Sequence, residues 1–344
     1  MQVNPVKMLF LMTLFGSILI SVSSTSWFGA WMGLEINLLS FIPLMSNGTN
    51  QRSTEASLKY FLTQTLGSIV LVLGTIYLYY SLKYMNSMFY SSSSLMMINS
   101  SLLLKMAAAP FHFWFPMVME GLTWMNALIL MTWQKLGPLM LLFYNLTMSM
   151  HLIMLTIILS SLVGGIGGLN QTMLRKIMAF SSINHLSWMM ASMMVSEILW
   201  LFYFILYITM SSAVVLFFSY NNVFHINQVY STVNMNSINK LFFSINLLSL
   251  GGLPPFTGFL PKWIVIQNLM QSSPLMIFIM IMSTLMTLFY YIRIIFLTLT
   301  MSSLTELWYS SDNLTKNWNF KIMIYVSLSS ILGLPSFLLV SSAL

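Results

Sequence analysis

Four charged residues lie inside apolar stretches of this sequence that are long enough to cross a membrane: Glu35, Lys105, Lys135 and Lys262. An ionised side chain at the centre of a membrane helix costs about 2.5–3.5 kcal/mol on insertion scales, so such a residue usually has a function. One carboxylate does not neutralise three ammonium groups, and both burial and like-charge repulsion favour the neutral amine of lysine. Because such an amine can take up and release a proton, these residues predict proton transfer.

A structural interpretation of the same four residues stays open. Each lysine could extend its amine to the membrane surface or pair with a partner subunit, and Glu35 could form a pair that only packs two helices together.

Two histidines extend the candidate set. His185 lies among hydroxyl and amide side chains near the centre of an apolar stretch. The ordinary pKa of histidine, about 6.5, suits a proton relay, and a hydrogen-bonded structural histidine is the alternative. His112 follows Pro110, where it could either cap the backbone that the proline frees or pass protons.

The composition identifies the class of fold that must position these residues. Of 344 residues, 6% are charged and 58% are hydrophobic, whereas soluble domains have about 25% charged residues. The mean hydropathy of +0.85 agrees with a surface that faces lipid. The apolar runs are continuous and lack the alternation of membrane β-strands. We therefore expect an all-α polytopic membrane protein.

Several other classes of function are excluded. The chain has no cysteine, which excludes Cys-ligated zinc and iron–sulfur clusters. Basic residues are scattered, with Arg175-Lys176 as the one adjacent pair, so we expect no nucleic-acid partner. The run Gly164–Gly168 resembles a nucleotide-binding loop, but it follows no strand and lacks a Lys-Ser/Thr pair. Close helix packing is the better interpretation of these glycines. We expect no metal site.

Apolar runs separated by polar turns predict about eleven membrane helices, each of about 20 residues. Their approximate spans are 5–23, 26–45, 57–81, 95–119, 123–144, 149–168, 174–194, 198–220, 240–270, 275–299 and 320–342.

Basic residues predict the orientation of these helices. On the face of the N-terminus we place nine of them, and on the opposite face only Lys83. The nine are Lys7, Arg52, Lys59, Arg175, Lys176, Lys240, Arg293, Lys316 and Lys321. Because basic residues stay on the cytoplasm-like side, we expect the N-terminus on the matrix side. With eleven helices, the C-terminus then lies in the intermembrane space.

Two of the predicted helices contain matching proline patterns. Pro110 and Pro116 have the same spacing as Pro255 and Pro261, and the two patterns lie 145 positions apart. They lie in the fourth and ninth predicted helices, an offset of five, and because five is odd the second copy must be inverted relative to the first. Helices broken at matching positions of inverted repeats are typical of secondary transporters, where the breaks mark the ion pathway. Two unrelated proline kinks are the alternative.

The fold that we expect therefore has two inverted five-helix repeats with proline-broken helices. The first repeat covers about 1–145 and the second about 146–299, and one C-terminal helix follows at about 320–342.

Longer blocks of the sequence resemble a known family, the antiporter-like proton-pumping subunits in the membrane arm of respiratory complex I (NADH–ubiquinone oxidoreductase). The chain resembles the insect form of this family, and the resemblance covers almost the whole chain. The blocks are Trp31–Phe41, Ala108–Pro116, Glu120–Ala127, Gly167–Thr172 and Gly251–Trp263. Bacterial members have fourteen helices, and loss of three at the N-terminus leaves eleven.

The resemblance implies a set of pathway residues that matches the candidates above. The family uses a glutamate on an early helix, a lysine at the first broken helix, a lysine on the next helix, a central histidine and a lysine at the second broken helix. By motif these are Glu35, Lys105, Lys135, His185 and Lys262.

Two positions depart from the family pattern, since Ala107 and Ser187 stand where the family usually has glycine. We expect a stiffer turn before Pro110 and altered hydration near His185.

The resemblance also implies cofactors, partners and location. This chain would bind no cofactor, while NADH, FMN, iron–sulfur clusters and ubiquinone are used elsewhere in the complex. Its partners would be other membrane-arm subunits, neighbouring antiporter-like chains and lipids of the mitochondrial inner membrane, with cardiolipin among them. Two alternative functions are an autonomous cation/proton antiporter subunit and a structural membrane scaffold. The buried lysines argue against the scaffold.

Overall fold

The computed structural model describes residues 5–46, 50–84, 88–231 and 237–300. Within these ranges the regular structure is helical apart from one isolated bridge between Met173 and His225, so the expected all-α class is confirmed. The predicted helix at 320–342 lies outside the described residues.

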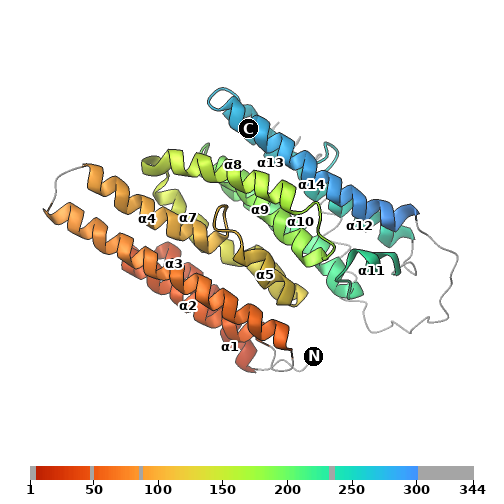
Figure 1. Ribbon diagram of the computed structural model, residues 1–344, viewed down its shortest axis with the longest axis horizontal. Coiled ribbons are helices and arrows are strands. Elements are labelled where there is room, and N and C mark those ends of the chain that lie inside the picture. The colour runs from red at the N-terminus through yellow and green to blue at the C-terminus, as the bar shows by residue number, and fades with distance from the viewer. Residues whose placement is uncertain (1–4, 47–49, 85–87, 232–236, 301–344) are drawn as a thin grey trace. The chain divides into compact units, whose positions relative to one another are not determined.

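The chain divides into two compact units, Met1–Ser160 and Ser161–Leu344, each of which is a group of packed helices (Figure 1). The first unit contains α1 (Pro5–Ser23), α2 (Trp27–Met45), α3 (Gln51–Tyr84), α4 (Met88–Met106), α5 (Trp114–Gly121), α6 (Trp124–Met131), α7 (Trp133–Tyr144) and the 3₁₀ turn η1 (Leu146–Ser149). In this unit α3 packs against α2, α4 and α5, while α7 packs against α1, α4 and α6.

Helix α8 (Met150–Gly167) runs from the first unit into the second. The second unit continues with α9 (Leu174–Met193), α10 (Glu197–Asn221), α11 (Ile226–Ser231), α12 (Ser237–Gly251), α13 (Phe259–Leu269) and α14 (Pro274–Thr300). Helix α9 contacts α10, α13 and α14, and nearly all of its side chains from Ile177 onward are buried. It is therefore the central helix of this unit.

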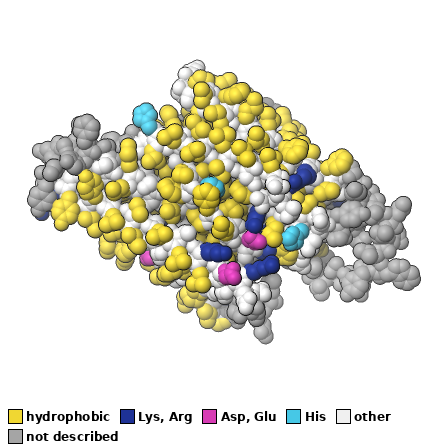
Figure 2. All heavy atoms as spheres, viewed as in Figure 1, with side chains coloured by type: hydrophobic (Ala, Val, Ile, Leu, Met, Phe, Trp, Pro, Cys, Tyr) yellow, Lys and Arg dark blue, Asp and Glu magenta, His cyan; other side chains and the backbone are white. Residues whose placement is uncertain are grey.

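Seven helices of the described ranges are long and apolar enough to cross a membrane. They begin at Pro5, Trp27, Gln51, Trp124, Met150, Glu197 and Pro274, close to the starts of the corresponding predicted spans. Hydrophobic side chains are spread widely over the described part of the face shown in Figure 2, as expected for a protein surrounded by lipid. The count of eleven stays a prediction.

Two predicted spans are divided at the expected prolines. The chain leaves the helical path between α4 and α5 around Pro110, and between α12 and α13 around Pro255. A third interruption was not predicted: Thr132 separates α6 from α7, and it lies before Pro138 in the sequence.

The glycines near the end of α8 serve close packing, as expected. A Cβ atom at Gly164 would lie 2.7 Å from the backbone nitrogen of Asn184 in α9. One at Gly167 would overlap the ring of Phe180. Helices α8 and α9 therefore approach each other more closely than side chains at these positions would allow.

Candidate functional site

Lys105 lies in the last turn of α4, with its side chain buried, and the helix ends directly after it. The end is a Schellman motif, in which Ala107 N–H donates to Leu104 O at 3.1 Å and Ala108 N–H to Leu103 O at 3.0 Å. The motif requires a left-handed residue, and Ala107 has φ 61°. Because an L side chain is strained in this conformation, alanine at this position destabilises the turn relative to glycine.

Neutral side chains satisfy the carbonyl groups that this break exposes. Trp114 Nε1 donates to Leu104 O at 3.1 Å, and Gln64 Nε2 donates to Lys105 O at 3.4 Å. His112 does not cap either of these two groups. Its ring instead forms a hydrogen bond with the Pro110 backbone and lies 4.2 Å from the Phe113 ring, while Nδ1 is buried and has no hydrogen-bond partner. The amine of Lys105 is therefore not needed to close the break.

Lys135 lies in the first turn of α7 and is buried, with 2% of its surface exposed. Its amine lies 5.3 Å from the centre of the Phe115 ring, a cation–π distance that suits an ammonium group. The interruption at Thr132 sets the start of α7, and the Lys135 N–H donates to Thr132 O at 3.2 Å.

Lys105 and Lys135 line the same cavity inside the first unit, although 30 positions separate them in sequence. The space open to water centres is about 20 Å³, which is room for about one water molecule. Its polar lining also includes Asn37, Gln64 and Gln134. The structure thus brings together two of the predicted lysines at a site that can hold water.

The amide groups of this cavity were not predicted from the sequence. Asn37 Nδ2 donates to Gln134 Oε1 at 2.9 Å, and Gln134 Nε2 donates to Asn37 Oδ1 at 3.0 Å. The hydroxyl of Tyr60 also donates to Gln134 Oε1, at 3.3 Å. Each amide stands close in sequence to a predicted site residue, Glu35 or Lys135, and that was the available signal.

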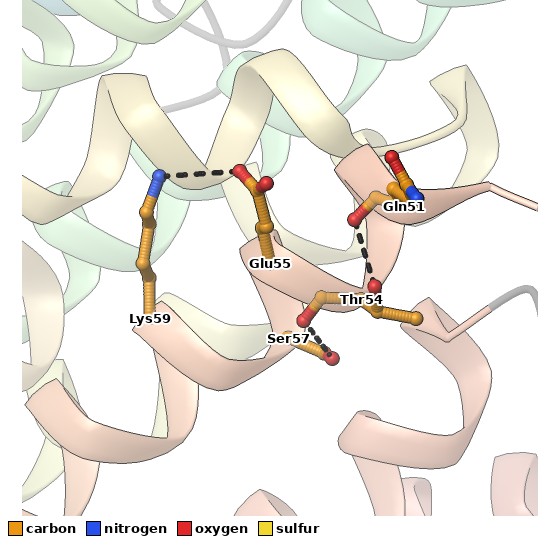
Figure 3. Close-up of polar contacts among 5 residues, drawn as sticks. All are labelled: Gln51, Thr54, Glu55, Ser57 and Lys59. Carbon is orange, nitrogen blue, oxygen red and sulfur yellow. Dashed lines mark hydrogen bonds and ion pairs between the residues drawn. The ribbon is translucent and has the colours of Figure 1, made fainter.

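Glu35 is half-buried on α2, and its Oε2 is a buried acceptor without a hydrogen bond. The Glu35 carboxylate and the Lys105 amine do not form a contact ion pair. Glu55 and Lys59 on α3 differ: they pair directly at 3.8 Å, but in an exposed position (Figure 3). An exposed pair of this kind adds little stability.

In the second unit, Lys262 lies in the first turn of α13 and is buried. Its Nζ donates to Gly251 O at 3.1 Å, so this amine caps the end of α12. Gly252 follows with φ 83°, a left-handed conformation that suits glycine.

His185 lies near the middle of α9 and is buried, with 3% of its surface exposed. Its Nδ1 is 3.1 Å from the Tyr203 hydroxyl, and its ring centre is 5.2 Å from that of Tyr207. The hydroxyl of Ser187, expected to alter the hydration of His185, instead donates to Asn184 O at 2.6 Å. The Tyr203 hydroxyl is a suitable hydrogen-bond partner for His185 in both interpretations, as a proton relay and as a structural residue.

The predicted residues thus form two groups. Glu35, Lys105, Lys135 and His112 belong to the first unit, and His185 and Lys262 belong to the second. Within the described ranges, no cluster of His, Asp or Glu side chains could hold a metal ion.

A family model described as "NADH:quinone oxidoreductase/Mrp antiporter, TM" matches residues 24–287. This chain therefore belongs to the NADH:quinone oxidoreductase/Mrp antiporter family of membrane proteins. Curated relatives place it more narrowly, with the proteins named NADH-ubiquinone oxidoreductase chain 2. It is 50% identical over 317 residues to that protein of Anopheles gambiae, covering 92% of each chain. It is 49% identical to that of Aedes aegypti, covering 95% of each chain.

A solved structure supports the fold. A chain in respiratory complex I from Thermus thermophilus with bound aureothin superposes with a TM-score of 0.85 at 20% identity. The match covers 96% of this chain and 78% of that chain. The helical fold and the expected family are therefore confirmed, and the chain is a subunit of the kind found in complex I.

Proposed function

We propose that this chain translocates protons as an antiporter-like membrane-arm subunit of mitochondrial NADH–ubiquinone oxidoreductase. One observation carries the proposal most directly: two buried lysines share a cavity large enough for water. A purely structural subunit gives no reason to bury two amines beside each other, because their charged forms repel and lose hydration.

The chemistry of this cavity follows from its charges. Two ammonium groups on one small cavity repel each other, so a state in which Lys105 and Lys135 hold one proton between them is favoured. A negative charge on Glu35, in the same unit, would favour the proton on Lys105. When that influence weakens, the proton passes to Lys135. Movement or protonation of Glu35 would therefore drive one transfer step.

In the second unit, His185 and Lys262 would continue the transfer. Tyr203 gives His185 a hydroxyl partner at 3.1 Å, and Lys262 lies at the second helix break. We infer the order Glu35, Lys105, Lys135, His185 and Lys262 for the pathway, with His112 beside the first break as an additional proton carrier.

The partners of the chain would be other membrane-arm subunits, including neighbouring antiporter-like chains, together with membrane lipid such as cardiolipin. Redox chemistry with NADH, FMN, iron–sulfur clusters and ubiquinone would occur in those other subunits.

We propose a matrix-side N-terminus and a C-terminus in the intermembrane space. Protease accessibility in mitoplasts tests this, because a C-terminal tag should be cut without breaching the inner membrane. A tag that is cut only after the breach contradicts the orientation.

An autonomous antiporter is the second candidate, because the matching family model also covers Mrp antiporters. Transport by the purified chain in liposomes would support it. We expect no such transport, because the energy for pumping would come from redox subunits.

Replacement of Lys105 tests the proposed function. We expect Lys105→Met to reduce proton translocation coupled to NADH oxidation by about tenfold or more. Loss of the amine removes one proton carrier, and a proton-transfer barrier that rises by about 1.4 kcal/mol slows the step tenfold. Lys105→Arg should not restore it, because arginine stays protonated. Lys83→Met is the matched control at an exposed lysine and should leave translocation unchanged. If the assembled Lys105→Met complex pumps normally, the lysine is structural and the proposal is wrong.

A further inference from the structure

The amide pair between α2 and α7 has hydrogen-bonding capacity that the protein does not use. Asn37 and Gln134 each donate one N–H and accept one bond from the other. The oxygen of Gln134 also accepts from Tyr60. An amide has two N–H groups and an oxygen with two lone pairs, so each nitrogen keeps one N–H and the Asn37 oxygen keeps one lone pair.

The residues that carry these spare groups line the same cavity as Lys105 and Lys135. Asn37, Gln134 and Tyr60 are all part of its wall. The cavity holds about one water molecule, and a buried water needs two to four polar partners, about three on average. The two amines and the amide pair can supply that number. Asn37 is buried, with 3% of its surface exposed, so its spare groups are otherwise without bulk water.

We propose that the Asn37–Gln134 pair, braced by Tyr60, positions the water through which Lys105 and Lys135 exchange a proton. This inference rests on the proposed function and names two positioning residues for it. In one transfer, the ammonium of Lys105 gives a proton to the water while the water gives another proton to the neutral amine of Lys135. The water is unchanged, and one proton has moved from the first nitrogen to the second.

An amide suits this role better than a carboxylate or an imidazole. It both donates and accepts hydrogen bonds, yet it neither gains nor loses a proton under physiological conditions. It can therefore orient a water without holding the proton itself. The reciprocal bonds between α2 and α7, with Tyr60 on α3, fix both amides from three helices.

The test compares two double variants in the assembled complex. Asn37→Leu with Gln134→Met replaces both amides by apolar side chains of similar size. It leaves one buried donor, the Tyr60 hydroxyl, without its partner, at a cost of about 1–3 kcal/mol in stability. Asn37→Gln with Gln134→Asn exchanges the two side chains and keeps an amide on each helix. We expect proton translocation per NADH oxidised to fall about tenfold in the apolar pair, and to recover at least partly in the exchanged pair.

The solvent isotope effect separates positioning from structure. If proton transfer through water becomes slower, the ratio of translocation rates in H₂O and D₂O should rise in the apolar pair. A structural defect would lower both rates without changing their ratio.

Lys135→Met distinguishes failure of this inference from failure of the proposed function. If the apolar pair pumps normally while Lys135→Met does not, the amides have no positioning role and the proposed function stands. If Lys135→Met also pumps normally, the proposed function itself is wrong. If the complex that carries the apolar pair does not assemble, Tyr60→Phe is the variant to test. It keeps the ring and removes only the hydrogen bond from Tyr60 to Gln134. Unchanged translocation and an unchanged isotope effect in Tyr60→Phe would then overturn the inference.

Discussion

The two helix breaks share a backbone motif at positions 145 residues apart. Helix α4 ends at Met106 and α12 at Gly251, and both ends are Schellman motifs. The matching bonds are Ala107 N–H to Leu104 O and Gly252 N–H to Ser249 O, at 3.1 Å in each case. The next residues, Ala108 and Leu253, donate to Leu103 O and Leu248 O. The following helices begin at Trp114 and Phe259, again 145 apart.

The breaks differ in the groups that cap them. At the first break, Trp114 and Gln64 donate to the exposed carbonyls, and Lys105 lines a cavity instead. At the second, the amine of Lys262 caps Gly251 O. The same backbone therefore supports two different uses of a lysine. Lys105 contributes little to the break, whereas Lys262 is part of its structure.

The left-handed residue also differs, and this difference predicts the largest effect. Gly252→Ala would place a Cβ 2.8 Å from Lys262 Nζ and so crowd the amine that caps Gly251 O. The backbone conformation itself costs an L residue about 1–2 kcal/mol, and this strain adds to the loss of the Lys262 bond. We expect a marked loss of assembled complex on native gels and a loss of translocation. The matched control is Ala107→Gly, which relieves strain but increases the entropy of the unfolded chain, and it should change stability by less than about 1 kcal/mol. Equal effects of the two variants would contradict the comparison.

A smaller effect separates the two lysines. Lys262→Met removes the donor to Gly251 O and leaves a buried carbonyl unsatisfied, at a cost of about 1–3 kcal/mol. Lys105→Met removes no such bond. We therefore expect Lys262→Met to lower both the melting temperature of the complex and its translocation, and Lys105→Met to lower translocation alone. Identical melting temperatures would show that the Lys262 bond does not stabilise the break.

The smallest effect concerns the neutral cap of the first break. Trp114→Phe keeps an aromatic ring, as Phe259 does at the matching position, but loses the bond to Leu104 O. The loss should cost about 0.5–1.5 kcal/mol in stability, as for other single hydrogen bonds. Thermal unfolding of the purified complex measures it. Translocation should stay close to normal, and a large loss there would give Trp114 a role that the structure does not indicate.

Matching breaks support the inverted-repeat interpretation, which stays a prediction. It requires residues 1–145 to superpose on 146–290 after a half-turn about an axis in the membrane plane. An experimental structure of the complex tests this, and breaks at unrelated depths would leave two separate proline kinks.

Hydropathy and charge in the sequence were enough to predict the helical class, the two breaks and the burial of Lys105, Lys135 and Lys262. These features depend on local composition, because a proline or a charge in an apolar run is visible in the sequence alone. The Asn37–Gln134 pair could not be found in this way, because its partners are 97 positions apart. The interruption at Thr132 was also missed, since Pro138 gave the only local signal and lies further along the chain.

The central claim is that Lys105 and Lys135 exchange a proton through water in one cavity. The most direct measurement is a cryo-EM map of the assembled complex at a resolution that shows ordered water. We predict a water within hydrogen-bonding distance of both amines and of the Asn37–Gln134 pair. A dry cavity, with apolar side chains filling the space between the two amines, would contradict the account.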